Sequence, residues 1–379
     1  MQMKRRKRNM VKKKTEKVHE PLFHIAKRDK MPLWQSLLIR LGAIVAALVL
    51  CGIICYVFID IAPFKLYGTM FKGVFGSGRR IWKMLKDLAV LLCISLAVTP
   101  AFKMRFWNIG AEGQVLMSCL ASVACVIYFG ESMPNWLLLI CMAAAAILVG
   151  AVWAVIPAIF KAQWDTNETL FTLMMNYVAT SLVSYFLIVW VPSGSSTLGE
   201  LKTGHMPVIG GSDFAGSRYL ILILIVAAIT AGMYIYLNYC KPGYEISVVG
   251  ESQRTACYIG INVKKVIIRT LIVSGALCGI AGFLIVSALD HSVTTASAGG
   301  QGFTAIMVSW LAKFNPLIMI ATSFLIVFLQ QGVDQVATDC GISNAFPDII
   351  VGIILFFIIG CEFFINYRII FRKKEVAAK

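Results

Sequence analysis

The residues best suited to bind a polar solute lie in the stretch Phe106–Gln114, which reads FWNIGAEGQ. Glu112 and Gln114 stand at the start of an otherwise apolar segment, where an ionisable group is costly in lipid and usually faces a cavity or a partner. Gly110 and Gly113 permit an unwound turn or the close approach of another helix. The stretch therefore predicts one wall of a solute path. The alternative is a helix start in water, where Glu112 only favours the positive end of the helix dipole.

Further polar residues precede and enter the next apolar segments. Side chains in 165–169 can cap the helix that follows, and the two candidate pairs are Thr166 with Thr169 and Asp165 with Glu168. Asn176 lies deeper, where an amide needs a partner on another helix or a ligand. Gln301 and Gln330 are candidates near a second polar break. We predict a substrate path lined by Asn108, Glu112, Gln114, Asn167, Asn176 and Gln301.

The sequence contains no catalytic motif. HExxH, GxSxG and a carboxylate pair beside a buried histidine are all missing, as is the phosphate-binding loop of an ATPase. The eleven cysteines and four histidines show no metal-ligand spacing. We therefore expect no enzyme activity, no metal and no bound cofactor. If the protein pumps a solute, its energy comes from a partner or from an ion gradient.

The composition indicates a membrane protein. The chain is 59% hydrophobic and only 14% charged, whereas a soluble protein carries roughly 25% charged residues. Much of the net charge of +16 comes from Lys and Arg crowded into residues 1–40. A nucleic-acid arm is one interpretation of this run, but basic flanks of a first span stay in the cytosol and meet anionic lipid. We predict a basic cytosolic tail over 1–40, a transmembrane domain over 41–367, a cytosolic tail over 368–379, and no nucleic-acid partner.

Apolar segments of about 20 residues, the length that spans a bilayer, recur along the chain. The predicted spans are 41–61, 84–102, 109–129, 136–160, 169–191, 219–239, 266–289 and 346–367. A loop of basic residues without acids, 62–83, is predicted outside, against the rule that basic loops stay inside. The chain is thus an all-α polytopic protein.

The segment Phe303–Leu329 allows two topologies. Phe303–Phe314 is too short to cross, and Lys313, Asn315 and Pro316 interrupt it before Leu317–Leu329 resumes. A single span would place the basic C-terminal tail outside, with the acidic loop Gln331–Ala345 inside. A helical hairpin reverses both assignments and obeys the positive-inside rule. We predict the hairpin, about ten transmembrane helices, and both termini in the cytosol.

The polar breaks at 108–114 and 299–302 occupy matching places in two halves of opposite orientation. Matching breaks of this kind are typical of an inverted repeat whose broken helices meet near a midplane pathway. The sequence therefore predicts an inverted-repeat core.

The loop 241–265 predicts a small water-exposed helix. Gly250 is expected to break the chain, Ser252 to cap a helix over Gln253–Ile259, and Gly260 to end it. Basic residues flank the helix on both sides. A capped helix on the basic side of a membrane protein is a candidate docking element for a soluble partner, although it can also be an ordinary connection.

Four of these motifs, in order, resemble one family. FWNIGAEGQ is similar to the FNIGAEGQ signature of permease subunits of nucleoside and simple-sugar ABC importers, in the branched-chain amino acid/ribose-type permease family. The other three, which are similar to further segments of that family, are NETLFTLMMNYVA at 167–179, VVGESQRTACYIGIN at 248–262 and GGQGFTAIMVSWLAKFNP at 299–316. The resemblance runs from about 85 to 363. Departures are Trp107, Ser252, Cys257, Ser309 and Trp310.

The resemblance implies a type II-like ABC importer permease that carries nucleosides or a related ribosyl or sugar solute. Its implied partners are a second permease or a copy of itself, a cytosolic ATPase that uses the ATP, and an extracytoplasmic substrate-binding lipoprotein. The segment at 248–262 then corresponds to the helix that couples to the ATPase, with Gly250, Glu251, Ser252, Arg254, Ala256 and Gly260 as its candidate residues. The alternative is an ion-coupled secondary transporter that acts alone through Glu112.

Overall fold

The computed structural model describes residues 23–28, 32–59, 62–191, 198–208, 218–343 and 345–371. These residues are mostly helical, and they divide into two compact units, one formed by Met1–Pro63 with Asp348–Lys379 and one by Phe64–Pro347. Most of the predicted tail 1–40 and residues 372–379 of the predicted C-terminal tail lie outside the described residues.

The first unit contains two long helices and a pair of short strands. The helices are α2 (Leu33–Ile59) and α14 (Ala345–Asn366), and the strands β1 (Phe23–Lys27) and β2 (Tyr367–Phe371) pair antiparallel with Phe23 opposite Phe371. Exposed valines and isoleucine recur every fourth residue along α2, at Val45, Val49, Ile53 and Val57. Such a stripe, exposed yet apolar, suits contact with lipid. The strand pairing was not predicted.

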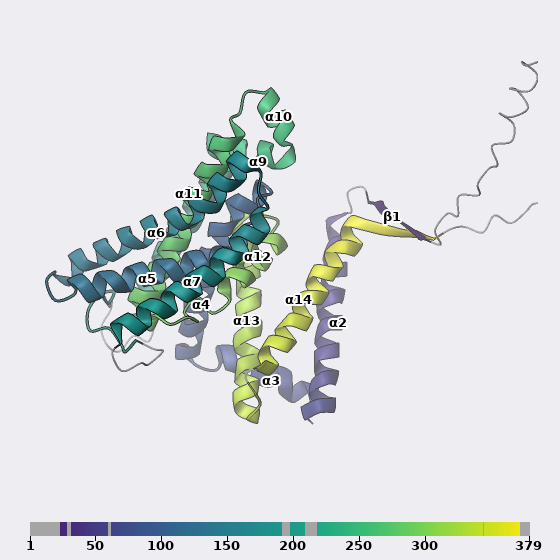
Figure 1. Ribbon diagram of the computed structural model, residues 1–379. Helices are drawn as coiled ribbons and strands as arrows, with labels where there is room; N and C mark the ends of the chain where they lie inside the picture. Colours follow the sequence, from purple (N-terminus) through teal and green to yellow (C-terminus); the bar gives the residue numbers. More distant parts are fainter. Residues whose placement is uncertain are drawn as a thin grey trace, which may run out of the picture. The chain divides into compact units, whose positions relative to one another are not determined.

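The second unit holds the remaining elements (Figure 1). They are α3 (Pro63–Phe75), α4 (Gly78–Lys103), α5 (Ala111–Phe129), α6 (Asn135–Trp164), α7 (Glu168–Trp190), α8 (Leu220–Asn238), α9 (Lys241–Glu251), α10 (Gln253–Tyr258), α11 (Val263–Leu284), the π-helix η1 (Ile285–Asp290), α12 (Gln301–Leu311) and α13 (Pro316–Cys340).

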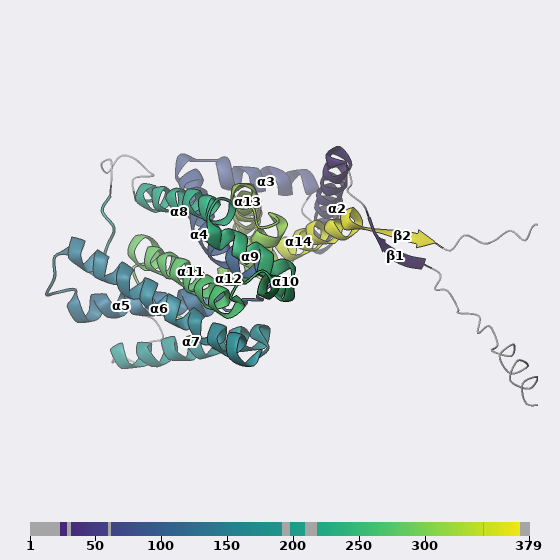
Figure 2. The ribbon, with the colours of Figure 1, turned by 90° about the horizontal axis from the view of Figure 1, so that it is seen from above.

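Seven helices among the described residues are long and apolar enough to cross a membrane: α4, α5, α6, α7, α8, α11 with η1, and α13. Shorter apolar stretches lie in α2 and α14, at Leu41–Val57 and Ile349–Ile365. In Figure 2, α11 lies centrally, between α6 on one side and α4 with α8 on the other. The side chains of α4 and α11 are mostly buried, whereas α6, α7 and α8 expose apolar faces. The fold is therefore that of an all-α polytopic membrane protein, as predicted.

Small residues bring the central helices together. Gly275 and Gly279 are four residues apart on α11, and a Cβ on Gly279 would lie 2.6 Å from the carbonyl oxygen of Ala146 on α6. Close backbone approach through such small-xxx-small pairs is the usual means of helix packing in lipid. This contact anchors α11 beside α6.

Three local expectations were wrong. The predicted basic loop 62–83 contains the helix α3. Gly250 does not break the chain, because α9 continues through it to Glu251. The predicted loop Gln331–Ala345 is largely helical, because α13 runs to Cys340 and holds its polar side chains in pairs, with Gln331 donating to Asp87 at 2.6 Å and Gln335 to Asp339 at 2.6 Å.

The predicted hairpin also needs correction. Its first arm, α12, is short as expected, and Lys313 and Phe314 take positive φ angles of 51° and 61° after it. Its second arm is not short: Asn315 caps α13 by accepting from Leu317 N at 3.0 Å, and α13 has 25 residues. At 1.5 Å per residue that is long enough to cross a bilayer. A half-length helix is thus followed by a full span.

Candidate functional site

Residues 104–110 form the first break, between α4 and α5. Arg105 has φ 60°, which ends the helix, and the side chain of Asn108 is completely buried. Asn108 Oδ1 accepts from Gly110 N at 3.1 Å and from Gln114 Nε2 at 3.3 Å, and its Nδ2 donates to Ser274 Oγ of α11 at 3.4 Å. The amide thereby satisfies backbone polar groups that a helix would otherwise pair.

Helix α7 supplies two more side chains to the first break. Asn176 Oδ1 accepts from Gly113 N at 2.9 Å, and its Nδ2 donates to Ile109 O at 3.0 Å. Thr172 Oγ1 accepts from Ile109 N at 3.2 Å. The role of Thr172 was missed, although its position one turn before Asn176 places both on the same face. The partners that were predicted for Asn176 on another helix are therefore backbone groups, the N–H of Gly113 and the carbonyl of Ile109.

Residues 291–300 form the second break, between η1 and α12. Its backbone turns through positive φ angles at His291, Gly299 and Gly300. Glu112 of α5 reaches this break: its Oε1 accepts from Gly300 N and its Oε2 from Gly302 N, both at 2.8 Å. A carboxylate there caps α12 and meets the positive end of its dipole. The two breaks, predicted in matching halves, therefore meet through Glu112.

The six predicted path residues divide by what their side chains bind. Three of them, Asn108, Glu112 and Asn176, form hydrogen bonds with backbone groups. Asn167 is exposed and caps α7, accepting from Thr169 N at 3.1 Å. The predicted capping pairs at 165–169 were therefore wrong. Gln114 and Gln301 each keep a buried Oε1 without a hydrogen-bond partner among the described residues. An unpaired buried acceptor is costly, so these two atoms are available to a donor from solute or water.

Two tryptophans lie in contact where the first break meets the C-terminal end of α12. Trp107 belongs to the first break and Trp310 to α12; their ring centroids are 5.1 Å apart, and both are nearly half exposed. Phe102 packs edge-on against them at 5.9 and 6.3 Å. Beside them, Ser309 Oγ and Thr99 Oγ1 form a buried hydrogen bond of 2.8 Å. Three of the five residues that depart from the family signature, Trp107, Ser309 and Trp310, thus lie close together in space.

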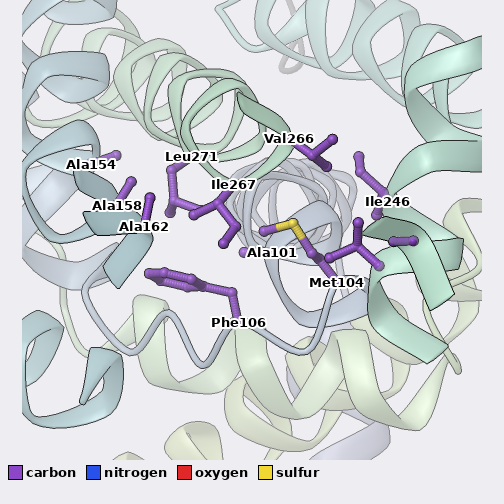
Figure 3. Close-up of a cluster of buried hydrophobic side chains, with 12 residues drawn as sticks. Ala101, Met104, Phe106, Ala154, Ala158, Ala162, Ile246, Val266, Ile267 and Leu271 are labelled. Atoms are coloured by element: carbon purple, nitrogen blue, oxygen red, sulfur yellow. The ribbon is translucent and has the colours of Figure 1, made fainter. Parts of the chain in front are cut away.

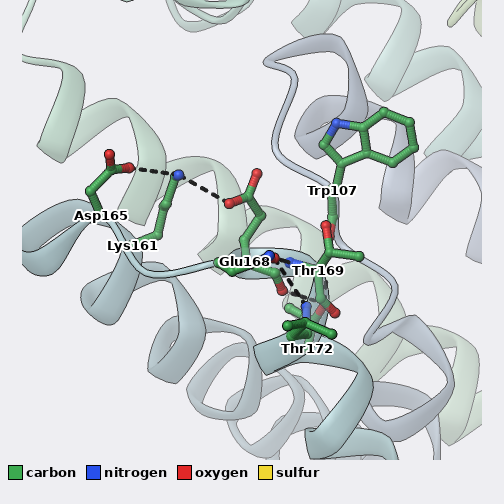
Figure 4. A network of polar contacts seen from close by, with 8 residues as sticks. Trp107, Lys161, Asp165, Glu168, Thr169 and Thr172 are labelled. Atoms are coloured by element: carbon green, nitrogen blue, oxygen red, sulfur yellow. Dashed lines mark hydrogen bonds and ion pairs between the residues drawn. The ribbon is translucent and has the colours of Figure 1, made fainter.

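A lysine joins the end of α6 to the start of α7 (Figure 4). Lys161 Nζ lies 2.6 Å from Asp165 Oδ1 and 3.0 Å from Glu168 Oε2. The hydrogen bond from Lys161 holds the pKa of the Asp165 carboxyl below its usual value. Asp165 is exposed, so this pair contributes little to stability. Its effect is to fix the α6–α7 corner beside Trp107, whose carbonyl oxygen accepts from Thr172 Oγ1 at 3.4 Å.

The capped helix predicted over Gln253–Ile259 is confirmed as α10, and its role in docking stays a prediction. Ser252 Oγ accepts from Thr255 N at 3.2 Å, and Gly260 has φ 85° after the helix end. Within α10 only Ala256 is buried, while Arg254 and Tyr258 are exposed. Beside α10 an open hollow of about 1000 Å³ has the charged groups Lys161, Asp165, Arg254 and Lys264 in its wall. This end of the molecule offers charged, exposed surface that suits a soluble protein.

One apolar cluster connects the docking helix to the first break (Figure 3). Ala256 of α10 packs in the same cluster as Met104 and Phe106 of the break, and the remaining members are Ala101, Ala154, Ala158, Ala162, Ile246, Val249, Val266, Ile267 and Leu271. Gly250 of α9 permits the close approach, because a Cβ there would clash with the carbonyl oxygen of Lys103. The cluster is therefore a continuous packed connection between α10 and the first break.

Fold and site together define a polytopic membrane permease with broken helices at its centre. Residues 81–359 match the model of the family described as branched-chain amino acid transport system/permease component, and the chain belongs to that family. The family comprises transporter subunits and not enzymes. The predicted membrane location and the predicted ABC permease class are thereby confirmed.

Characterised relatives support the same class. The chain is 28% identical to a glucose ABC transporter permease of Haloferax volcanii, over 90% of this chain and 92% of the relative. It is 27% identical to a guanosine ABC transporter permease of Bacillus subtilis, over 77% and 84% of the two chains. It is 26% identical to a nucleoside ABC transporter permease of Lactococcus lactis, over 86% and 91%.

Proposed function

We propose that this chain is the transmembrane subunit of an ABC importer that carries nucleosides, or a related ribosyl or sugar solute, into the cell. The relatives named for guanosine, nucleosides and glucose support this range of solutes. Within the path, the free carbonyl oxygens of Gln114 and Gln301 are the groups that accept hydrogen bonds from hydroxyl or amino groups of the solute. Asn108, Glu112 and Asn176 shape the path by holding the breaks.

The apolar cluster that contains Ala256 of α10 together with Met104 and Phe106 of the first break is the observation that carries the proposal. ATP is hydrolysed by a separate cytosolic ATPase, which binds α10. Closure of the ATPase displaces α10, and the apolar cluster transmits this displacement to the first break. Glu112 then transmits it to the N-terminus of α12. Alternating access results when α5 and α12 move together against the surrounding spans.

The assembly follows from this role. A second permease, identical or different, completes the path, and an extracytoplasmic lipoprotein delivers the solute. With α10 in the cytosol, we expect both termini to lie in the cytosol as well. Among the residues predicted for coupling, Gly250 allows α9 to approach α4, Ser252 and Gly260 delimit α10, and Ala256 anchors it. Glu251 and Arg254 are exposed and available to the ATPase.

The experiment compares charge reversals at two exposed basic residues. In Arg254→Glu we expect uptake of labelled guanosine to be abolished, because the charge on α10 that faces the ATPase is inverted, while the chain still reaches the membrane. Lys202→Glu, an exposed position in the segment 198–208, is the matched control. Normal stimulation of the ATPase by the loaded binding protein in Arg254→Glu would contradict the role of α10.

An ion-coupled transporter centred on Glu112 is less well supported. Both carboxylate oxygens of Glu112 accept backbone hydrogen bonds, which leaves the group poorly placed to coordinate an ion that must bind and leave. Solute uptake into liposomes that contain this chain without an ATPase would favour ion coupling. Uptake that requires both the ATPase and ATP would favour the importer.

A further inference from the structure

Helix α3 carries three different faces. Leu66, Met70, Gly73 and Val74 are buried, and two of them touch α13, because Met70 adjoins Gly332 and Gly73 adjoins Gln335; Figure 1 shows α3 crossing beside α13. A second face exposes Phe64, which is 93% exposed, together with Phe71 and Phe75. Lys65 and Lys72 lie on a third face, seven residues apart and adjacent to the phenylalanines.

The phenylalanine face continues onto a helix that crosses the membrane. The rings of Phe71 and Phe75 are 4.9 Å apart, Phe75 lies 6.1 Å from Phe328 of α13, and Phe328 lies 6.3 Å from the exposed Phe324. Because α13 is long and apolar enough to be a span, exposed aromatic side chains on it suit contact with lipid. The phenylalanines of α3 extend that surface, and in water they would form an unfavourable apolar patch.

The lysine face belongs to a strongly basic segment. Residues 62–86 contain six Lys and Arg and no acidic residue. Lys65, Lys72, Arg79 and Lys83 are exposed, whereas Arg80 Nη1 donates to the carbonyl oxygen of Lys72 at 2.9 Å and so closes the end of α3. An apolar stripe beside a basic stripe is the pattern of a helix that lies in the membrane–water interface.

We propose that α3 lies in the membrane interface and that Lys65 and Lys72 of α3, with Arg79 at the start of α4, bind the phosphate groups of anionic phospholipids. Phe64 and Phe71 enter the acyl region, and the basic side chains reach the headgroups. The site is at the opposite end of the second unit from α10, so it belongs to the outer leaflet if α10 is cytosolic. The proposal explains why a basic segment is found on the side that the positive-inside rule disfavours: α3 is held on the lipid surface by its phenylalanines.

Photo-crosslinking tests where the phenylalanine face lies. The variants Phe64→benzoylphenylalanine and Tyr258→benzoylphenylalanine place the same reactive group at two equally accessible positions, because Phe64 is 93% and Tyr258 92% exposed. After irradiation of whole cells that express the full transporter, we expect phospholipid adducts at position 64 and none at position 258. Adducts of position 64 with an extracytoplasmic protein, or phospholipid adducts equally at both positions, would overturn the proposal.

Lipid binding by the basic face is measured with the purified full chain in nanodiscs. Fluorescent phosphatidylglycerol is titrated into phosphatidylcholine nanodiscs, and Lys65→Gln/Lys72→Gln is compared with wild type and with Lys202→Gln. Each basic residue near an anionic surface contributes enough that losing two lowers affinity by roughly 30-fold, with Lys202→Gln unchanged. Equal affinities in all three proteins would overturn the proposal. Displacement of phosphatidylglycerol from both wild type and Lys202→Gln by inorganic phosphate, at constant ionic strength, would reassign the site to free phosphate.

Discussion

The two breaks in the core are held in different ways. The first is fastened by side chains from two other helices, α11 and α7: Asn108 reaches Ser274, while Thr172 and Asn176 bind the backbone of Ile109 and Gly113. The second turns through positive φ angles, and the first turn of α12 is bound across helices by the two oxygens of Glu112. The first break is therefore held by several neighbouring side chains, whereas the start of α12 is bound across helices through Glu112 alone and its far end touches the first break through Trp310.

The largest effect is expected from removing that attachment. Glu112→Ala eliminates two charge-assisted hydrogen bonds, each contributing about 1.5–3 kcal/mol. We expect amide exchange at 300–303 to accelerate strongly, while exchange at 108–110 changes little. Glu112→Gln, which keeps one acceptor, should give an intermediate rate. Equal acceleration at both breaks would show that they are held as one unit.

A smaller loss of stability is expected when a side chain that holds the first break is removed. Asn176→Leu leaves Ile109 O and Gly113 N buried and unpaired, at a cost of about 1–3 kcal/mol each. The melting temperature in detergent should fall clearly. Ser181→Ala on the same helix is the control, because its hydroxyl only donates to the carbonyl of Tyr177 at an exposed position. If the two variants melt alike, the first break does not depend on α7.

Solute binding should depend on one acceptor from each break. Gln114→Ala and Gln301→Ala each remove a carbonyl oxygen that has no protein partner among the described residues. One hydrogen bond contributes about 1 kcal/mol, so each variant should raise the KM for uptake roughly 5-fold. Gln330→Ala is the matched control. If only one of the two variants, Gln114→Ala or Gln301→Ala, changes the KM, the solute contacts a single break and not both.

The smallest effect is a pH dependence confined to the second break. Burial and the neighbouring His205 lower the pKa of His291, with Glu200 opposing this shift and Arg218 adding to it. The folded state therefore prefers neutral His291: its stabilisation is complete above the unfolded pKa of about 6.5 and is lost as pH falls through the lower folded pKa. Acid should loosen the contact between Leu201 N and His291 O, which is 2.8 Å long. Thermal unfolding against pH should show this loss in wild type and not in His291→Gln.

Periodicity and length predicted most of the spans, because a bilayer demands long apolar helices whatever their neighbours. The cap of α10 was predictable for a similar reason: Ser252 and Thr255 lie within one turn of each other. The partner of Glu112 was not predictable, because Gly300 and Gly302 lie far along the chain and only the fold brings them close. Helix α3 was missed because its lysines suggested a loop. Its phenylalanines indicate an apolar helix face only once the fold places them against Phe328 of α13. Asn167 was overlooked as a cap because four neighbouring side chains could equally serve.

The attachment of α12 at Glu112 is tested most directly by the ratio of solute imported to ATP hydrolysed. The complete transporter is reconstituted in proteoliposomes with wild-type chain or Glu112→Ala, and labelled guanosine uptake is measured together with phosphate release. We predict that the variant still binds its ATPase and hydrolyses ATP, because α10 and the first break are intact, but imports almost no solute. An unchanged ratio in Glu112→Ala would contradict the role of Glu112 in joining the two breaks.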